Sequence, residues 1–442
     1  MATRILLVNP PIYDFSAYDF WLKPYGLLSV GGFLRGQAEL RLWDYMDRLS
    51  SLVPDPSLQP LSPQGRGARR HRQDEWGRGE YHSEIILCPE IFAGIRRRYR
   101  RFGIPRNAFR EFLAAEGPFD FALIQTGMTY WYPGVQEVIA DLRRAHPQTR
   151  IVLGGVYATL CPRHAHTLGA DLVVAGTDLG PLWRFLKLAP RQDGLPLWDC
   201  YPRLSSGVLK LTDGCPFRCT YCSVPQIYQG FSPRPSDRVL AEADFLCGRD
   251  AENIAFYDDA LLHQAERILE PFLREFLKRG VRVNFHTPNA INARFVSKDL
   301  ARLMVDAGFK IIYLGFESSA EGWQRETGGK VTAGDLARAI ENLVAAGADP
   351  RHLHAYLMLG HPRAGQQQLE NSMRFASSLG IRLMLAEFSP LPGTPDGELC
   401  RQWVDLDEPL SHNKTAFAIK LLGEEGVNRF KNLCRELNAG QA

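Results

Sequence analysis

Three cysteines lie close together in the stretch Leu211-Thr-Asp-Gly-Cys215-Pro-Phe-Arg-Cys219-Thr-Tyr-Cys222-Ser223. Their spacing is C-x3-C-x2-C. An apolar run at residues 208–211 precedes them, which predicts a buried strand that leads into a loop. Three thiolates on one tight loop can hold three irons of a [4Fe–4S] cube. The fourth iron then has no protein ligand, so a small molecule can bind it.

A zinc loop and buried structural thiols are the two other interpretations of these cysteines. Structural zinc sites usually take four ligands from paired knuckles, and the sequence has no second C-x2-C pair. The spacing therefore favours the cluster, with Cys215, Cys219 and Cys222 as its metal ligands.

The cysteine spacing, with Tyr221 directly before the last cysteine, resembles the radical S-adenosylmethionine (radical SAM) superfamily. The resemblance implies that the open iron binds the amine and carboxylate of SAM. It also implies reductive cleavage of SAM to methionine and a 5′-deoxyadenosyl radical. An external electron donor such as flavodoxin or ferredoxin is implied as a partner, together with a small-molecule substrate.

The composition is that of a globular protein with more than one domain. The chain has 442 residues, which favours two or three domains. A net charge of +3 is too small to indicate a nucleic-acid partner. The other six cysteines are scattered, so a reducing compartment is expected rather than a disulfide framework. With no signal peptide and no long apolar run, we expect a cytoplasmic protein without a membrane partner.

Strands and helices alternate in the first half of the chain, which predicts a Rossmann-like, doubly wound parallel sheet. The predicted strands cover residues 4–8, 40–44, 119–124, 151–155 and 171–175, and the helices 25–34, 135–144 and 182–186. Such sheets bind ligands beyond the carboxyl ends of their strands. Here these ends carry Asn9-Pro10-Pro11, Thr126-Gly127 and Gly154-Gly155.

Residues 1–195 resemble the cobalamin-binding domain that precedes many radical SAM cores. The resemblance rests on the opening N-P-P, the Y-G-L-L-S-V-G-G helix from Tyr25 and the L-G-G strand end at Gly155. It implies cobalamin as a further cofactor, with Thr126, Gly154 and Gly155 beside it, since paired glycines let a nucleotide tail approach the backbone. No D-x-H-x-x-G loop follows Val8, so no lower cobalt ligand is assigned. The alternative is a cofactor-free scaffold or substrate platform.

Residues 51–118 interrupt the predicted sheet. Residues 50–67 are rich in Pro, Ser, Gln and Gly and predict a loop. Two basic runs suggest contact with an anionic substrate or RNA, but a solvated helix face and a flexible loop are the favoured interpretation. The runs are Arg66, Arg69, Arg70, His71 and Arg72, then Arg96, Arg97, Arg98, Arg100 and Arg101. The aromatic stretch at residues 128–134 either closes over a planar ligand or packs against the second domain.

Residues 196–395 repeat strand–helix units, which predicts a parallel barrel or part of one. The strands are expected at 208–211, 253–257, 281–285, 311–316, 354–359 and 382–388. A helix is expected over 262–278, a second after an N-cap at Ser297, and a third after a capping box of Thr332 and Asp335. Radical SAM cores are similar, with a (β/α)6 partial TIM barrel. Residues 396–442 have a helical pattern and are expected to cap the open side.

Polar residues stand at the ends of the predicted barrel strands, where barrel enzymes carry their chemistry. By resemblance, Asp258 and Asp259 correspond to the segment that contacts the methionine amine, and Glu317 to the one near the SAM ribose and carboxylate. Gly360 lies in a G-x-P turn expected near the adenine, and His361 is expected to be a satisfied loop histidine. Helix capping is the alternative role for the carboxylates.

The sequence thus predicts a radical SAM enzyme, and the resemblance favours a cobalamin-dependent radical methyltransferase. One alternative is a radical rearrangement, cyclisation or oxidation with the N-terminal domain as a scaffold. The other is an iron–sulfur RNA-binding protein. No catalytic residue is assigned.

Overall fold

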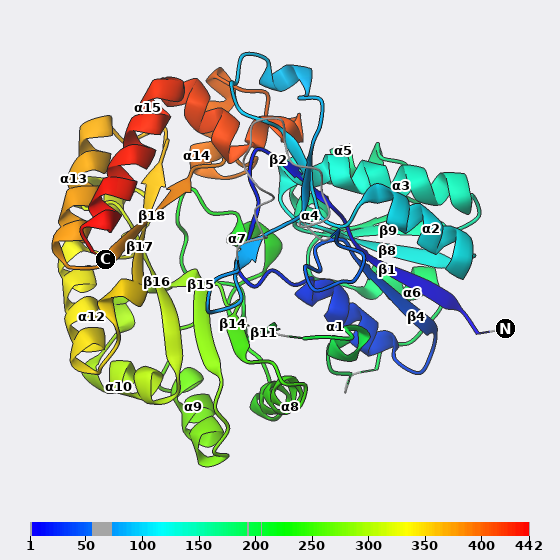
Figure 1. Ribbon diagram of the computed structural model, residues 1–442, viewed down its shortest axis with the longest axis horizontal. Coiled ribbons are helices and arrows are strands. Elements are labelled where there is room, and N and C mark those ends of the chain that lie inside the picture. The colour runs from blue at the N-terminus through cyan, green and yellow to red at the C-terminus, as the bar shows by residue number, and fades with distance from the viewer. Residues whose placement is uncertain (1, 55–72, 192–193, 205, 442) are drawn as a thin grey trace. The chain divides into compact units, whose positions relative to one another are not determined.

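The computed structural model describes residues 2–54, 73–191, 194–204 and 206–441, and these form two compact units (Figure 1). The first unit extends to Leu204 and also includes Asp407–Leu410. The second unit holds the rest of the described chain. The first basic run, at residues 66–72, lies outside the described residues.

A five-stranded parallel sheet with the order β10-β9-β8-β1-β4 forms the centre of the first unit. Its strands are β1 (Arg4–Asn9), β4 (Glu39–Asp44), β8 (Phe121–Thr126), β9 (Arg150–Gly155) and β10 (Leu172–Val174). The helices are α1 (Tyr25–Leu34), α2 (Arg106–Glu116), α3 (Tyr132–Ala145), α4 (Val156–Leu160), α5 (Pro162–His166) and α6 (Gly180–Leu186). The chain leaves β1 toward β4 on one side and later adds β8 on the other. The predicted doubly wound sheet is confirmed, with its switch point between β1 and β8.

The insertion contributes two strands, β6 and β7, to a three-stranded antiparallel sheet with the order β2-β7-β6, in which β2 comes from residues before the insertion. The three strands are β2 (Ile12–Asp14), β6 (Ser83–Ile85) and β7 (Arg100–Phe102). Two further short strands, β3 (Tyr18–Asp19) and β5 (Gly79–Glu80), form a separate antiparallel pair. The expectation of a helix for the second basic run is therefore wrong, while Arg96 and Arg98 are exposed in the loop before β7. Arg101 is buried in β7 and its guanidinium pairs with Glu137 of α3 at 2.7 Å. Because Glu137 binds Arg101 in the interior, this part of the basic run forms a buried strand and not an exposed helix.

Six parallel strands in the order β11-β14-β15-β16-β17-β18 form the second unit, which confirms the (β/α)6 partial barrel. The strands are β11 (Ser206–Leu209), β14 (Asn253–Phe256), β15 (Asn284–Asn292), β16 (Phe309–Glu317), β17 (Leu353–Leu359) and β18 (Arg382–Glu387). The helices are α7 (Val224–Ile227), α8 (Ser236–Cys247), α9 (Leu269–Lys278), α10 (Lys298–Asp306), α11 (Glu321–Glu326), α12 (Ala333–Ala345), α13 (Gln366–Ser378), α14 (Pro395–Glu398) and α15 (Lys414–Ala439).

Two predicted boundaries in the barrel are wrong. The helix expected from residue 262 begins at Leu269, because Gln264 has a positive φ of 56° that a continuous helix does not allow. The third strand, expected at residues 281–285, runs from Asn284 to Asn292. It passes through a register shift between Thr287 and Ile291, so the polar residues at 286–289 lie within the strand.

The C-terminal helix α15 packs on the last barrel strand, β18 (Figure 1). Asn438 accepts a hydrogen bond from the Leu383 N–H at 2.7 Å and donates one to the Leu383 carbonyl at 3.0 Å. These bonds satisfy backbone groups on an edge strand. Among the described residues, none of the helices is long and apolar enough to cross a membrane.

Candidate functional site

The loop with the three cysteines begins where β11 ends and is closed at its base by a short antiparallel pair. In this pair Thr212–Asp213 (β12) faces Ser232–Pro233 (β13). Gly214 turns the chain into the loop with a φ of 73°, and a Cβ there would lie 1.9 Å from the Gly230 carbonyl oxygen. Only glycine fits this turn. The three cysteines, Cys215, Cys219 and Cys222, are free thiols that are partly exposed.

Asp258 fixes the point at which the strand becomes the loop. Its Oδ1 accepts hydrogen bonds from the N–H groups of Leu211 (2.9 Å) and Thr212 (2.6 Å) and from the Thr212 hydroxyl (2.7 Å). Burial raises the pKa of Asp258 to about 6, although the Thr212 hydrogen bonds and the Lys210 charge oppose the shift. Its Oδ2 is buried without a hydrogen-bond partner, so one oxygen is left for another donor.

Asp259 follows directly, and its charge acts on the cysteine loop. Burial raises the pKa of its carboxyl group, and the positive charge of Lys210 acts in the opposite direction. Its negative charge acts on the Cys215 and Cys222 thiols, where it adds to the effect of burial and raises their pKa values. Neither aspartate serves as a helix cap in the described structure.

Glu317 ends β16 next to a lysine that the sequence analysis did not select. The residue has a positive φ of 60°, which a non-glycine residue adopts at a cost. Its Oε1 lies 3.8 Å from Lys330 Nζ, and its Oε2 is buried without a hydrogen-bond partner. A Cβ at Gly315 would lie 3.0 Å from Lys330 Nζ, so this glycine leaves room for the pair.

Lys330 connects Glu317 with the cysteine loop. Burial raises the thiol pKa of Cys219, and the positive charge of Lys330 acts against that shift. The turn before Lys330 packs on the loop, since a Cβ at Gly328 would lie 3.1 Å from the Cα of Cys219. In the sequence, Lys330 is marked only by the two glycines that precede it, and this pattern matches none of the motifs that indicate a binding site. The structure therefore brings together Glu317, Lys330 and the three cysteines.

Aromatic rings line the cysteine loop. The ring of Tyr221 stacks on that of Trp323, with centroids 6.0 Å apart and planes 13° apart. Phe217 contacts the rings of His263 and Phe295 at centroid distances of 6.1 Å. These contacts limit the freedom of the loop on both sides of Cys219.

Gly360 and His361 follow β17 as a tight turn. Gly360 has a φ of 78°, and a Cβ there would lie 3.2 Å from Ala418 of α15. This close approach gives the glycine a structural role, while its contact with adenine stays a prediction. His361 is buried, with its Nδ1 3.2 Å from Trp323 Nε1 and its Nε2 3.0 Å from Asp396 Oδ2. The prediction of a satisfied histidine is confirmed.

The predicted cobalamin contacts lie at the carboxyl ends of β8 and β9. Gly155 has a φ of 112°, and a Cβ there would lie 2.4 Å from the Thr126 carbonyl oxygen. The Thr126 hydroxyl accepts a hydrogen bond from the Ala158 N–H at 3.0 Å. A Cβ at Gly154 would meet its nearest atom, the Val174 carbonyl oxygen, only at 4.0 Å. Open space is therefore found at Gly154 and not at Gly155.

The aromatic stretch after β8 packs within the first unit. The indole N–H of Trp131 donates to Asp14 at 3.1 Å. Tyr132 stacks on Tyr157 at 6.0 Å, and its hydroxyl donates to Glu408 at 3.2 Å. These contacts explain the aromatic composition without a ligand.

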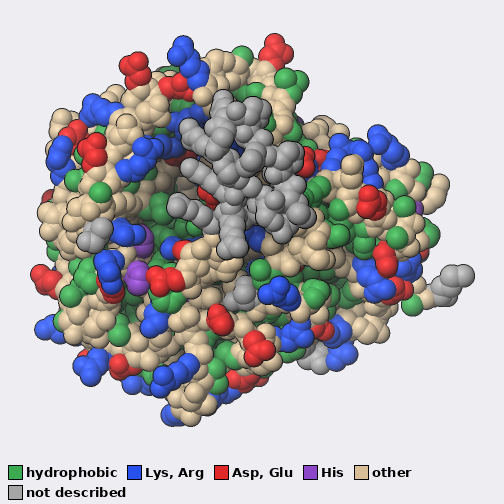
Figure 2. All heavy atoms as spheres, viewed as in Figure 1, with side chains coloured by type: hydrophobic (Ala, Val, Ile, Leu, Met, Phe, Trp, Pro, Cys, Tyr) green, Lys and Arg blue, Asp and Glu red, His purple; other side chains and the backbone are tan. Residues whose placement is uncertain are grey.

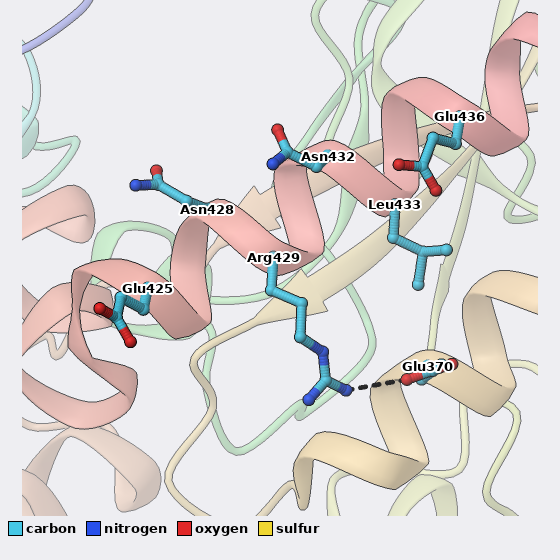
Figure 3. Close-up of a pocket in the computed structure, with 7 residues that line it drawn as sticks. All are labelled: Glu370, Glu425, Asn428, Arg429, Asn432, Leu433 and Glu436. Carbon is cyan, nitrogen blue, oxygen red and sulfur yellow. Dashed lines mark hydrogen bonds and ion pairs between the residues drawn. The ribbon is translucent and has the colours of Figure 1, made fainter.

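A surface pocket of about 620 Å³ lies between α13 and α15 (Figure 3). Arg429 and Glu370 form a 2.8 Å ion pair in it. The lining residues are Glu370, Glu425, Asn428, Arg429, Asn432, Leu433 and Glu436, and none of them is a predicted site residue. Among the residues that the structure describes, no three His, Cys, Asp or Glu side chains are arranged to hold a single metal ion.

The family model of the Radical SAM superfamily matches residues 209–376, from the end of β11 into α13. These residues form a radical SAM domain. The match contains all three cysteines, Asp258, Asp259, Glu317 and Gly360, so the predicted radical SAM domain is confirmed.

Three curated relatives match part of this chain at low identity. They are an uncharacterized methyltransferase, PH0819, of Pyrococcus horikoshii (24% identity over 51% of this chain), an uncharacterized methyltransferase, sll1242, of Synechocystis (24% over 70%), and the ribosomal protein uS12 methylthiotransferase RimO of Moorella thermoacetica (26% over 58%). The matched regions cover 45%, 62% and 64% of these relatives, so this chain spans about half to two thirds of their length.

Two solved structures have the same fold across most of this chain. The radical SAM methyltransferase TsrM of Kitasatospora setae aligns with a TM-score of 0.63 and 15% identity, over 90% of this chain and 76% of its own. The cobalamin-dependent radical SAM enzyme OxsB aligns with a TM-score of 0.57 and 14% identity, over 98% of this chain and 61% of its own. At this identity the likeness concerns the fold alone.

Proposed function

We propose that the protein is a radical SAM enzyme in which Cys215, Cys219 and Cys222 hold a [4Fe–4S] cluster. The observation that carries the proposal is the position of three free thiols on one loop beside Glu317 and Lys330. Three thiolates leave one iron open, and the positive charge of Lys330 partly balances the negative charge that the loop carries in the bound state. The residues present therefore fit the cluster.

The same end of the barrel offers acceptors for SAM. Glu317 Oε2 and Asp258 Oδ2 are buried and have no partner among the described residues. A buried acceptor without a donor is costly, and the amine and ribose hydroxyls of SAM are donors. Bound cluster and SAM would supply a 5′-deoxyadenosyl radical, with the electron delivered by a donor such as flavodoxin or ferredoxin. The substrate is expected to be a small molecule.

Cobalamin-dependent methyl transfer is the reaction that the comparisons favour. TsrM was solved with cobalamin and a [4Fe–4S] cluster bound, OxsB with aqua-cobalamin and SAM, and two relatives are called methyltransferases. The first unit has the sheet on which such a cofactor would lie. The open backbone at Gly154, with Thr126 on the next strand, is where we expect the nucleotide tail.

Two observations favour a second candidate, a radical enzyme whose first unit is a scaffold. The space beside Gly155 is filled by Thr126. At the end of β4, Asp44 accepts hydrogen bonds from Tyr201 (2.6 Å) and Asn9 (2.7 Å), so this part of the strand edge is occupied by the protein's own side chains. Such an enzyme would use SAM for a rearrangement, cyclisation or oxidation.

RNA binding receives little support from the basic runs. Arg101 of the second run forms a buried ion pair with Glu137 of α3, so it is not free to bind phosphate. On the face drawn in Figure 2, basic and acidic side chains are interspersed. Specific nucleic-acid surfaces usually gather basic residues on one face.

The test is the content of iron, sulfide and cobalt per chain after anaerobic purification. Methyl transfer predicts a cluster together with bound cobalamin, whereas the scaffold alternative predicts a cluster without cobalt. Protein that binds neither iron nor SAM after reconstitution would contradict both.

A further inference from the structure

A buried carboxylate from the C-terminal part of the barrel holds the middle of the cysteine loop. Asp396 lies in α14, after the last barrel strand, and is fully buried. Its Oδ2 accepts a hydrogen bond from the hydroxyl of Thr220, the residue between Cys219 and Tyr221. Its backbone N–H donates to the Thr220 carbonyl oxygen at 3.1 Å. One residue therefore binds Thr220 through both its side chain and its backbone.

The remaining polar group of Thr220 is bound from another direction. Its N–H donates to the Thr327 carbonyl oxygen at 3.1 Å, in the segment that leads to Lys330. The backbone of the loop closes on itself within this region, since the Cys222 N–H donates to the Cys219 carbonyl oxygen at 3.1 Å. All hydrogen-bonding groups of Thr220 are thus engaged, and its partners lie far away in sequence.

The carboxylate is in turn oriented by a hydrogen bond from His361 and an ion pair with Arg363. Nδ1 of His361 accepts from the Trp323 indole and from the Arg363 N–H, each at 3.2 Å. Its Nε2 therefore carries the proton and donates to Asp396 Oδ2 at 3.0 Å. The Arg363 guanidinium lies 2.9 Å from the other oxygen, Oδ1. Two hydrogen-bond donors, Thr220 and His361, share Oδ2, and the Arg363 cation pairs with Oδ1, an arrangement that suits a charged carboxylate better than a neutral amide.

The charge state of Asp396 agrees with this geometry. Burial acts to raise its pKa, but the hydrogen bonds from His361 and Thr220 and the charge of Arg363 outweigh burial, so the pKa lies below its usual value. The group is an anion at neutral pH, and its hydrogen bonds are charge-assisted.

We infer that Asp396 is a positioning residue for the cluster, which acts through Thr220 to hold Cys219 and Cys222 at the spacing that three irons require. This inference rests on the proposed cluster. It assigns a role to α14, which has none in the proposed function. Asp396 touches no reacting group. Its effect is expected in how firmly the loop holds iron.

The experiment compares iron retention in the reconstituted full-length protein. Thr220→Val removes the hydroxyl and keeps the shape of the side chain, while Thr220→Ser keeps the hydroxyl. Asp396→Asn removes the charge. Thr415→Val is the matched control, because Thr415 also donates to a buried carboxylate, Glu387, at 2.6 Å in the same unit. The measurement is the rate of iron transfer to a ferrous chelator under anaerobic conditions.

We expect Thr220→Val and Asp396→Asn to lose iron about tenfold faster than the wild type, because each variant loses one charge-assisted hydrogen bond that holds the loop. Thr220→Ser and Thr415→Val should retain iron at the wild-type rate, and the thermal unfolding of the apoproteins should differ little between Thr220→Val and Thr415→Val. The electron paramagnetic resonance spectrum of the reduced cluster should change in the two fast variants.

The inference would be overturned if Thr220→Val lost iron at the wild-type rate. It would also be overturned if Thr415→Val lost iron as fast as Thr220→Val, because loss of iron would then reflect general destabilisation. The two proposals fail in different ways. Wild-type protein that takes up no cluster would overturn the proposed function itself, whereas a normal cluster in every variant would overturn only the role of Asp396.

Discussion

Oε1 of Glu317 lies 3.8 Å from Nζ of Lys330, and the two side chains are only 12% and 19% exposed. The two residues come from different segments, the end of β16 and the turn before α12. The pair leaves Glu317 Oε2 without a partner and places the lysine beside the cysteine loop. It therefore joins the predicted SAM contact to the predicted cluster ligands.

Replacement of Glu317 by alanine should weaken SAM binding and leave the cluster spectrum intact. The loss of one charge-assisted hydrogen bond corresponds to about 1.5–3 kcal/mol of binding free energy. Equilibrium binding of SAM to the reconstituted protein measures the effect, with Glu321→Ala, an exposed glutamate of α11, as the control. Unchanged SAM affinity in Glu317→Ala would leave Glu317 with a structural role only.

The ionisation of Asp258 should make the apoprotein less stable as the pH rises. Burial raises its pKa from 3.8 to about 6 in the folded state. Stability from the neutral acid is therefore fully present below the unfolded pKa and is lost as the pH rises through the folded pKa. Asp258→Asn keeps the acceptor oxygen for Leu211 and Thr212 and does not titrate.

Relative to Asp258→Asn, the wild type should thus lose about 3 kcal/mol of unfolding free energy between about pH 4 and pH 7. Urea unfolding of both apoproteins across this range measures the difference. A difference between the two proteins that does not change with pH would show that Asp258 titrates normally.

Gly154, rather than Gly155, is the position at which a side chain tests cobalamin binding. A Cβ at Gly155 would lie 2.4 Å from Thr126 O at a φ of 112°, so Gly155→Leu would destabilise the first unit whether or not a ligand binds. Gly154→Leu should leave the unfolding temperature nearly unchanged, and should reduce the binding of hydroxocobalamin, followed by its absorption spectrum. Full binding by a folded Gly154→Leu protein would exclude the nucleotide tail from this position.

The buried ion pair between Arg101 and Glu137 should dominate the anchoring of the insertion. Both side chains are 3% exposed, so Arg101→Met leaves a buried carboxylate without its main partner and should cost about 3–5 kcal/mol. Arg98→Met, at an exposed position of the same basic run, should change stability by less than about 0.5 kcal/mol. Urea unfolding compares the two variants, and equal effects would argue against this anchoring role.

Local patterns in the sequence were sufficient wherever local forces decide the structure. The apolar run before Asn9 predicted β1, and the helix expected at residues 25–34 is α1. The capping box of Thr332 and Asp335 is present with both reciprocal hydrogen bonds. In each case the deciding contacts lie within a few residues, so the sequence shows them directly.

Long-range contacts explain what the sequence could not show. Lys330 and Asp396 have no motif of their own, and their positions beside the cysteine loop depend on turns far away in the chain. Arg101 belongs to a basic run, yet it is buried because Glu137 of α3 accepts its charge. The late start of the predicted helix, at Leu269 and not at residue 262, follows from the φ of one residue, Gln264, whose side chain carries no such signal.

The formation of 5′-deoxyadenosine tests the central claim most directly. The reconstituted protein, with SAM and a strong reductant, should contain about four irons per chain and release 5′-deoxyadenosine. Cys215→Ala, Cys219→Ala and Cys222→Ala should each abolish both, while Cys88→Ala and Cys434→Ala should retain both. A wild-type protein with a full cluster and bound SAM that forms no 5′-deoxyadenosine would contradict the account, as would equal loss of iron in Cys88→Ala or Cys434→Ala.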